Sequence, residues 1–386
     1  MIELKDGGMT KQSTHTLILG AGGTGGHIYP ALSIADAFHE ASPSMRIVFC
    51  GEKGSLEESS VRKAGFEFYS ISAYPLPVKR VGSYVTWFLK NLRGIVSSLF
   101  FLRKERPSFV FGTGGYVTGP LIAAARLCRV PYFLHEQNSI PGRANRLFAK
   151  GARCVFISYE ASRSNFGDNV SLAFSGNPVR SIFQTLDKKS SRHELGLEPD
   201  TFLILITGGS LGAQTVNEAV EGLGTEAREG WLHFLKRYPE AQVVVSTGQL
   251  RDPSMAERLN SIPHVQAHNY IEDLPLWLSA SDLYIGRAGA MTLAEVTALA
   301  KPSVLVPFPY AADNHQNENA RIMKAAGASR VCKDRIFNAN VLLNTIEQLI
   351  SDPEALELMG KKAGELAVMD AAEKIVEKTF KMMDGA

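Results

Sequence analysis

Two glycine-rich turns carry the residue types best suited to binding an anion. Residues 20–27 (GAGGTGGH) follow the apolar run 16–19, and residues 208–213 (GGSLGA) follow the apolar run 202–206. Glycine lets backbone amides approach a ligand closely, and a helix that begins at such a turn adds a partial positive charge. We therefore expect one phosphate-binding turn in each half of the chain.

His27 closes the first turn and is a candidate general base. Pro30 follows it, and proline is tolerated in the first turn of a helix, so we expect His27 at the phosphate-facing end of that helix. A helix N-terminus disfavours imidazolium and keeps the ring neutral, which is the form that accepts a proton. The alternative is that His27 only caps or packs the helix.

The first turn also contains the GxGxxG pattern of dinucleotide-binding folds, at residues 20–25. In those folds an acidic residue about 20 positions further on binds the ribose. Glu52 is the candidate here, but it lies further from the turn than that. The spacing makes binding of NAD or FAD the weaker interpretation.

The second turn contains the GxSxG pattern of a serine hydrolase, with Ser210 as the nucleophile. Asp282 or Asp313, followed by His315, would complete the order serine, acid, histidine. This interpretation leaves the first glycine turn unexplained, and it stays an alternative.

A third group of polar and small residues, 286–295 (GRAGAMTLAE), follows the apolar run 283–285. The amides and hydroxyl of residues 289–292 suit a phosphate, and Glu295 could accept hydrogen bonds from two vicinal ribose hydroxyls. The alternative is that Glu295 only complements the dipole of its helix. Residues 313–319 (DNHQNEN) add amide side chains, which donate and accept hydrogen bonds as sugar hydroxyls require.

The elements that must position these residues follow from the hydrophobic pattern. Nearly all-apolar runs alternate with helix-length amphipathic segments; the runs are 16–19, 46–50, 109–111, 132–134, 154–157, 202–206, 242–246, 283–285 and 303–306. This alternation predicts parallel sheets covered on both faces. The fold class is therefore α/β, with two doubly wound, Rossmann-like domains. A break at residues 176–180 marks their boundary, and the cleft between them is the expected active site.

Composition limits the class of protein. The chain has 386 residues, of which 45% are hydrophobic and 21% charged, as in a globular protein of two or three domains. The formal net charge of +2 gives no general reason to expect nucleic acid as a partner. The four cysteines form no CxxC, which favours the reducing cytosol, and no uncharged apolar run approaches the roughly 20 residues that cross a bilayer.

Six motifs in one order carry a resemblance to a known family. They are residues 22–27, 112–117, 135–138, 176–180, 208–213, and 289–295 with 316–320. From about Thr16 to the C-terminus, the chain resembles the bacterial MurG family. The resemblance implies a GT-B glycosyltransferase, with residues 14–177 as the acceptor domain and 178–360 as the UDP-GlcNAc domain. A last helix around residues 353–383 would return to the first domain, to which 361–386 would belong, and 1–13 would be an N-terminal extension.

The resemblance also implies roles for individual residues. Those implied to bind UDP-GlcNAc are Thr24, Gly25, Gly26, Asn138, Arg180, Ser210, Ile271, Ala290, Met291, Thr292, Leu293, Ala294, Glu295 and Gln316, and those implied to bind the acceptor are Gly114, Gly115 and Tyr116. His27 is the first candidate for the catalytic base and Glu136 the second. Ala294 stands where a common family pattern has serine, so it would act through its backbone.

The implied reaction is an inverting transfer of GlcNAc from UDP-GlcNAc to the C4 hydroxyl of MurNAc in undecaprenyl-pyrophosphoryl-MurNAc-pentapeptide (lipid I). The product, lipid II, serves peptidoglycan synthesis, and hence cell shape and division. The sequence contains no Asp-x-Asp, so we expect no metal and no redox cofactor. Alternatives are a glycolipid synthase acting on diacylglycerol, a UDP-GlcNAc 2-epimerase and an inactive nucleotide-sugar-binding protein.

A lipid-linked acceptor requires contact with a membrane, and residues 76–107 suit it. Basic residues outnumber the single acidic Glu105 there, and apolar residues follow helical spacing at Tyr84, Phe88, Leu92, Ile95 and Leu99. Such a stripe could rest among headgroups while the basic residues meet anionic lipid. The alternative is a helix packed inward. We expect a peripheral enzyme on the cytoplasmic face of the bacterial plasma membrane.

Overall fold

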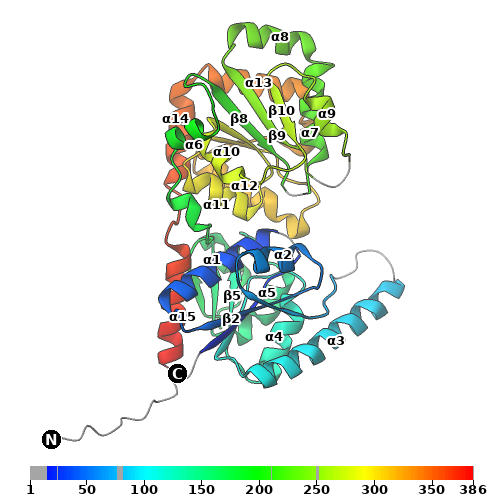
Figure 1. Ribbon diagram of the computed structural model, residues 1–386, viewed down its shortest axis with the longest axis vertical. Coiled ribbons are helices and arrows are strands. Elements are labelled where there is room, and N and C mark those ends of the chain that lie inside the picture. The colour runs from blue at the N-terminus through cyan, green and yellow to red at the C-terminus, as the bar shows by residue number, and fades with distance from the viewer. Residues whose placement is uncertain (1–14, 24, 76–80, 210, 249–251, 386) are drawn as a thin grey trace, which may run out of the picture.

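Two lobes, each built around a parallel β-sheet, make up the molecule (Figure 1). The structure is a computed structural model that describes residues 15–23, 25–75, 81–209, 211–248 and 252–385, without the side chains of 81–83. Thr24 and Ser210, which the sequence placed at the donor site, lie outside the described residues. The predicted α/β class with two doubly wound sheets is confirmed.

The sheet of the first lobe has, among the described residues, seven parallel strands in the order β3-β2-β1-β4-β5-β6-β7. The strands are β1 (Thr16–Gly20), β2 (Arg46–Gly51), β3 (Glu67–Ser70), β4 (Phe109–Gly112), β5 (Tyr132–Glu136), β6 (Cys154–Ile157) and β7 (Leu172–Phe174). The central strands β1, β4, β5 and β6 are buried along their whole length, which explains their uninterrupted apolar sequences.

Helices cover both faces of this sheet. They are α1 (Gly25–Ala41), α2 (Leu56–Lys63), α3 (Val81–Glu105), α4 (Thr118–Leu127) and α5 (Arg143–Phe148), with 3₁₀ turns at Ala149–Gly151 and Glu160–Asn165. On one face, Phe38 of α1 packs edge to face with Phe111 of β4. On the other, α3 and α4 pack together over a second core that contains Phe101 and Leu121. Each fully buried aromatic side chain of this kind contributes about 1.5–3 kcal/mol.

The sheet of the second lobe has six described parallel strands in the order β10-β9-β8-β11-β12-β13. They are β8 (Phe202–Thr207), β9 (Ala241–Ser246), β10 (Val265–His268), β11 (Leu283–Gly286), β12 (Ser303–Leu305) and β13 (Ser329–Val331). The helices are α6 (Lys188–Glu194), α7 (Gln214–Glu221), α8 (Arg228–Arg237), α9 (Met255–Leu259), α10 (Leu274–Ala280), α11 (Ala290–Ala298), α12 (His315–Ala325) and α13 (Ala339–Ile350). Short 3₁₀ turns lie at Ser181–Gln184, Gly222–Gly224, Ala312–Asn314 and Asp334–Ile336.

The C-terminal segment corrects one expectation from the sequence. Residues 353–383 do not form a single helix, because α14 (Pro353–Gly364) ends and α15 (Ala371–Asp384) begins after a break. Helix α14 packs against α11 of the second lobe, and α15 packs against α1 of the first. The break is needed because the chain must turn between the lobes there, beside the earlier crossing at Gly176 (Figure 1).

Strands β3, β7, β10 and β13 were not predicted from the sequence. All four have only three or four residues and lie at or near the sheet edges, where part of each strand is exposed. Because these strands are partly exposed, their sequences mix polar and apolar residues. They therefore lack the apolar run from which the other strands were predicted. The predicted strands themselves begin and end within a residue or two of the observed ones, and β5 continues through His135 and Glu136.

Candidate functional site

His27 lies in the first turn of α1, beside the carboxyl ends of β1, β4 and β5. Its Nδ1 atom lies 3.0 Å from the carbonyl oxygen of Thr113 and 3.2 Å from Oε1 of Gln137. Both partners are acceptors, so Nδ1 carries the proton and donates it. The other ring nitrogen, Nε2, therefore carries the lone pair, as a general base requires.

The surroundings of His27 favour the neutral ring. Its pKa is lowered from the usual 6.5, mainly because burial removes water from the charged form. The nearby carboxylate of Glu136 acts in the opposite direction and favours imidazolium. At neutral pH the ring can therefore accept a proton, and a negative charge close by stabilises the cation that results.

A second glycine-rich turn of the first lobe, Gly114–Tyr116, packs against His27. Gly115 has φ +80°, and a Cβ atom there would lie 1.9 Å from the carbonyl oxygen of Gly22, so only glycine fits. The Tyr116 hydroxyl donates to Oε2 of Glu52 at 2.9 Å. The structure thus brings the predicted acceptor-side turn into contact with the predicted base.

Glu136, the second candidate base, is 1% exposed and surrounded by donors. Its carboxylate accepts hydrogen bonds from the backbone amides of Asn138 and Gly142, both at 2.9 Å, and from Nδ2 of Asn145 at 2.8 Å. Both carboxylate oxygens therefore accept hydrogen bonds from protein donors. This geometry suits fixing the loop after β5.

The loop after β5 meets helix α12 of the second lobe. Oδ1 of Asn319 accepts hydrogen bonds from the backbone amide and hydroxyl of Ser139, at 3.0 and 2.8 Å. Nδ2 of Asn319 donates to Oδ1 of Asn138 at 3.3 Å. Asn138, which was predicted to bind the donor sugar, therefore lies where the two lobes touch.

The N-terminus of α11 is a candidate anion site in the second lobe. Gly289 precedes the helix, and no side chain caps it, so the amides of its first turn have no intrahelical partner. These amides belong to the predicted residues Ala290, Met291 and Thr292. Leu293 and Ala294 follow in the same helix.

Glu295, one turn further along α11, connects the lobes through Arg180. Nη2 of Arg180 lies 3.4 Å from Oε1 of Glu295, and the guanidinium lies 4.9 Å from the ring centre of Tyr29 in α1. Burial raises the pKa of Glu295, and the Arg180 charge lowers it. Residues 180 and 295, both predicted on the donor side, are therefore brought next to the helix that carries His27.

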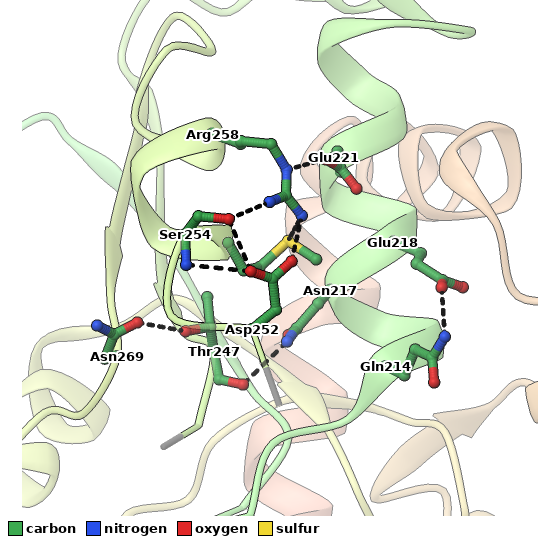
Figure 2. Close-up of polar contacts among 10 residues, drawn as sticks. Gln214, Asn217, Glu218, Glu221, Thr247, Asp252, Ser254, Arg258 and Asn269 are labelled. Atoms are coloured by element: carbon green, nitrogen blue, oxygen red, sulfur yellow. Dashed lines mark hydrogen bonds and ion pairs between the residues drawn. The ribbon is translucent and has the colours of Figure 1, made fainter. Parts of the chain in front are cut away.

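The glycine turn of the second lobe packs, at Gly212, against the loop that follows β9. A Cβ atom at Gly212 would lie 2.2 Å from the carbonyl oxygen of Thr247, which accepts from Nδ2 of Asn217 at 2.9 Å. Figure 2 shows Asn217 of α7 and Asn269 both directed at Thr247. Ile271, the predicted uracil contact, lies two residues after Asn269 in the chain and is buried.

The start of α12 is the most strained backbone near the cleft. Asp313 and Asn314 have φ values of 50° and 60°, the left-handed region that is unfavourable for residues other than glycine. These residues turn the chain so that α12 begins at His315, with Gln316 beside it. Oε1 of Gln316 accepts from the amide of Phe308 at 2.9 Å, which fixes the predicted sugar-binding amide.

The geometry does not assemble a serine-hydrolase triad from the predicted acids. Asp282 lies at the amino end of β11, where it accepts from the amide of Leu203, whereas the Gly208–Gly212 turn follows the carboxyl end of the parallel strand β8. Asp313 pairs with Arg146 at 2.7 Å, and Nδ1 of His315 donates to the carbonyl of Ala312.

The described part of the chain contains no group of three or more His, Cys, Asp or Glu side chains arranged to hold a metal ion. None of its helices is both long enough and apolar enough to span a bilayer.

Several contacts were missed when the sequence was interpreted residue by residue. Gln137 binds His27, Asn319 joins the lobes, and Glu57 binds the first glycine turn. Gln137 and Asn319 lie inside two of the six motifs, and their position in those motifs could have marked them as candidate site residues. Glu57 lies outside every motif, in an ordinary amphipathic helix, and nothing in its sequence context marks it.

Comparison with known proteins adds independent observations. The model of the glycosyltransferase family 28 N-terminal domain matches residues 17–157, and that of the C-terminal domain matches 203–375. The UDP-N-acetylglucosamine–N-acetylmuramyl-(pentapeptide) pyrophosphoryl-undecaprenol N-acetylglucosamine transferase of Desulfitobacterium hafniense (strain Y51) is 35% identical over 366 residues, covering 93% of this chain and 97% of that protein. The crystal structure of Acinetobacter baumannii MurG is 26% identical, with a TM-score of 0.72, over 95% of this chain and 99% of that one.

The chain belongs to the MurG family. Among more distant structures, a UDP-GlcNAc 2-epimerase from Neisseria meningitidis, bound to UDP-GlcNAc, has a TM-score of 0.65 at 17% identity, over 95% of this chain and all of that one. That likeness concerns the two-lobed fold alone. Membership of the MurG family confirms the resemblance drawn from the six motifs and the GT-B architecture.

Proposed function

We propose that this protein transfers GlcNAc from UDP-GlcNAc to the C4 hydroxyl of MurNAc in lipid I, giving lipid II with inversion. The observation that carries the proposal is the junction of α1 and α11: Tyr29, two residues after His27, stacks on Arg180, which pairs with Glu295. In a member of the MurG family, the packing of α1 against α11 supports a base on α1 that acts beside an anion-binding N-terminus of α11. Residues 14–177 with 361–386 bind the acceptor, and 178–360 bind the donor.

His27 acts as the general base. A sugar hydroxyl has a pKa far above neutrality, so its attack requires removal of the proton as the bond to UDP breaks. Nε2 of His27 takes that proton, while the bond from Nδ1 to Thr113 keeps the ring oriented. The carboxylate of Glu136, which favours imidazolium, stabilises the charge that forms on the ring.

The leaving diphosphate is stabilised by the second lobe. The uncapped amides at the N-terminus of α11 point toward the charge that develops on the departing phosphate, and Arg180 supplies a full positive charge nearby. Fixed donors of this kind need no rearrangement during the reaction. They supply the stabilisation that a bound cation provides in other transferases, so we propose a reaction without a metal.

Donor recognition uses groups from both lobes. Glu295 accepts hydrogen bonds from the ribose hydroxyls, and the backbone of Ile271 meets the uracil. Asn138 and Gln316 bind the hydroxyls of GlcNAc, a role that suits amide side chains. Thr24, Gly25, Gly26 and Ser210 contact the diphosphate and sugar.

The acceptor binds along Gly114–Tyr116, and α3 brings the enzyme to its lipid. In Figure 1 this helix lies along one side of the first lobe, and one of its ends projects beyond the rest of the lobe. Its Phe88, Leu92 and Phe100 side chains are exposed. We propose that these residues rest in an anionic leaflet at the cytoplasmic face of the plasma membrane, with the enzyme bound peripherally.

One assay separates this function from its alternatives. The purified protein is incubated with UDP-GlcNAc and either lipid I or diacylglycerol, and the lipid products are separated by chromatography. We expect product with lipid I, unchanged after exhaustive treatment with EDTA. Product with diacylglycerol alone would refute the assignment, and activity that is lost with EDTA and restored by magnesium would refute metal independence.

A further inference from the structure

Glu57 is a buried acid that the proposed reaction does not use. It lies in the first turn of α2 and is 2% exposed. No lysine, arginine or histidine within the described residues forms an ion pair with it. Burying a carboxylate without a cation is costly unless hydrogen-bond donors surround it.

The donors around Glu57 come mostly from the backbone. Oε1 accepts from the amide of Gly23 at 2.6 Å, and Oε2 accepts from the Ser55 hydroxyl at 2.5 Å and from the amide of Glu52 at 3.3 Å. A hydrogen bond to a charged acceptor is roughly twice as strong as one between neutral groups. The first glycine turn is therefore held at Gly23, where φ is +101° and a side chain would be strained.

The segment from Glu52 to Glu57 also binds the turn Gly114–Tyr116, which packs against His27. The Tyr116 hydroxyl donates to Glu52, and the Tyr116 ring lies against Gly23. In the same turn, Gly115 lies close to both the carbonyl of Gly22 and the His27 ring, which a Cβ atom there would meet. A shift of the Gly22–Gly23 backbone would therefore move both the acceptor-side turn and the base.

We propose that Glu57 is a positioning residue for transfer: it locks the first glycine turn so that His27 and Gly114–Tyr116 keep their mutual geometry. Because Glu57 binds the amide of Gly23, a bound diphosphate would use amides nearer the start of α1. The inference rests on the proposed function, since it assigns Glu57 to the same transfer, but its structural part can be tested separately.

The kinetic test compares Glu57→Ala and Glu57→Gln with Glu58→Gln, the adjacent acid, which pairs with Arg62 at the surface. Each kcat is divided by the fraction of protein that binds UDP, measured by calorimetry, so that loss of folded protein does not count. We expect Glu57→Ala to lower this normalised kcat about tenfold or more, with the Kd for UDP changed less than about twofold. Glu57→Gln, which can still accept from Gly23, should recover most of the rate, and Glu58→Gln should match the wild type.

The proposal would be overturned if Glu57→Ala had the same normalised kcat as the wild type. This includes the case in which the variant only contains less protein that binds UDP. Hydrogen–deuterium exchange gives a readout that does not depend on the reaction. Exchange in peptides covering residues 20–28 should be faster in Glu57→Ala and unchanged in Glu58→Gln. If the wild type fails to modify lipid I, the proposed function fails, whereas unchanged exchange in Glu57→Ala refutes the positioning role itself.

Discussion

The position of the proton on Nδ1 of His27 determines which ring nitrogen can accept another proton. Two acceptors, the Thr113 carbonyl and Gln137 Oε1, fix the proton on that nitrogen and leave Nε2 as the basic site. Gln137 is itself held, because its Nε2 donates to the Thr113 carbonyl at 2.7 Å. The proposed base is therefore oriented by the loops that follow β4 and β5.

Replacing His27 tests the base directly. We expect His27→Ala to lower kcat about 100-fold or more, with little change in the KM for UDP-GlcNAc, because general-base catalysis contributes at least that much. In the wild type the base must be neutral, and its pKa is lowered, so the rate should fall only as the pH drops below the ordinary value of 6.5. A midpoint of the acid limb above 6.5, or near-normal turnover of the variant, would contradict this role.

Glu295 should recognise the ribose rather than only neutralise Arg180. Hydrogen bonds to a charged group are worth about 1.5–3 kcal/mol, so Glu295→Ala should raise the Kd for UDP about tenfold or more in calorimetry. The control is 2′-deoxy-UDP, which the wild type should bind more weakly than UDP. The variant should bind the two nucleotides equally; if it still prefers UDP by the wild-type factor, the carboxylate does not bind the hydroxyl.

At the scale of elements, α3 differs from the other helices of the first lobe. It packs on α4 with one face and exposes large apolar side chains on another: Phe88 is 58% exposed and Phe100 is 67% exposed. Within the predicted stripe, Tyr84, Phe88 and Leu92 are exposed, whereas Ile95 and Leu99 are half-buried, so only part of the stripe is covered by the lobe. An apolar face beside lysines and arginines is the composition of an interfacial helix.

Flotation with liposomes tests this face. Phe88→Glu should abolish binding to vesicles that contain anionic lipid, because it places a charge where the headgroup region begins. Leu358→Glu, which changes a similarly exposed residue on α14 of the second lobe, is the matched control and should float like the wild type. Equal flotation of both variants would mean that α3 does not contact the membrane.

At the scale of the whole molecule, polar contacts such as Ser139 with Asn319 and Arg146 with Asp313 join the two lobes. The chain crosses between them near Gly176 and again between α14 and α15, where Val368 packs against Gly176. A cavity of about 250 Å³ lies beside both crossings, lined in part by Val179, Met323 and Val368.

The ion pair between Arg146 of the first lobe and Asp313 of the second should favour the arrangement in which the two lobes touch. Because both side chains are partly exposed, the pair is worth at most about 1 kcal/mol. Arg146→Asp should therefore lower kcat/KM up to about fivefold, by placing two like charges together. The double exchange Arg146→Asp with Asp313→Arg should restore the rate; failure to restore it would show that the residues act independently.

Much of the fold could be predicted from local sequence. Buried parallel strands are apolar on both faces, so β1, β4, β8 and β11 were visible as runs, and glycine turns after them marked the ligand-binding edge. Edge strands and the break between α14 and α15 were missed, because partial exposure and the path between lobes leave no periodic signal. Residue types within the motifs made His27 and Glu295 candidates, and their roles stay predictions.

The amino-acid sequence by itself determined the two α/β lobes, the glycine turns and the family, because strand burial and close backbone approach restrict residue types along the chain. Only the tertiary structure decided which groups meet. It placed the proton of His27 on Nδ1, surrounded Glu136 with donors, and brought Glu57 to Gly23, since these contacts join residues that are distant in sequence. Hydrogen bonding depends on the distance and direction between two groups, and local sequence does not give either for residues that are far apart in the chain.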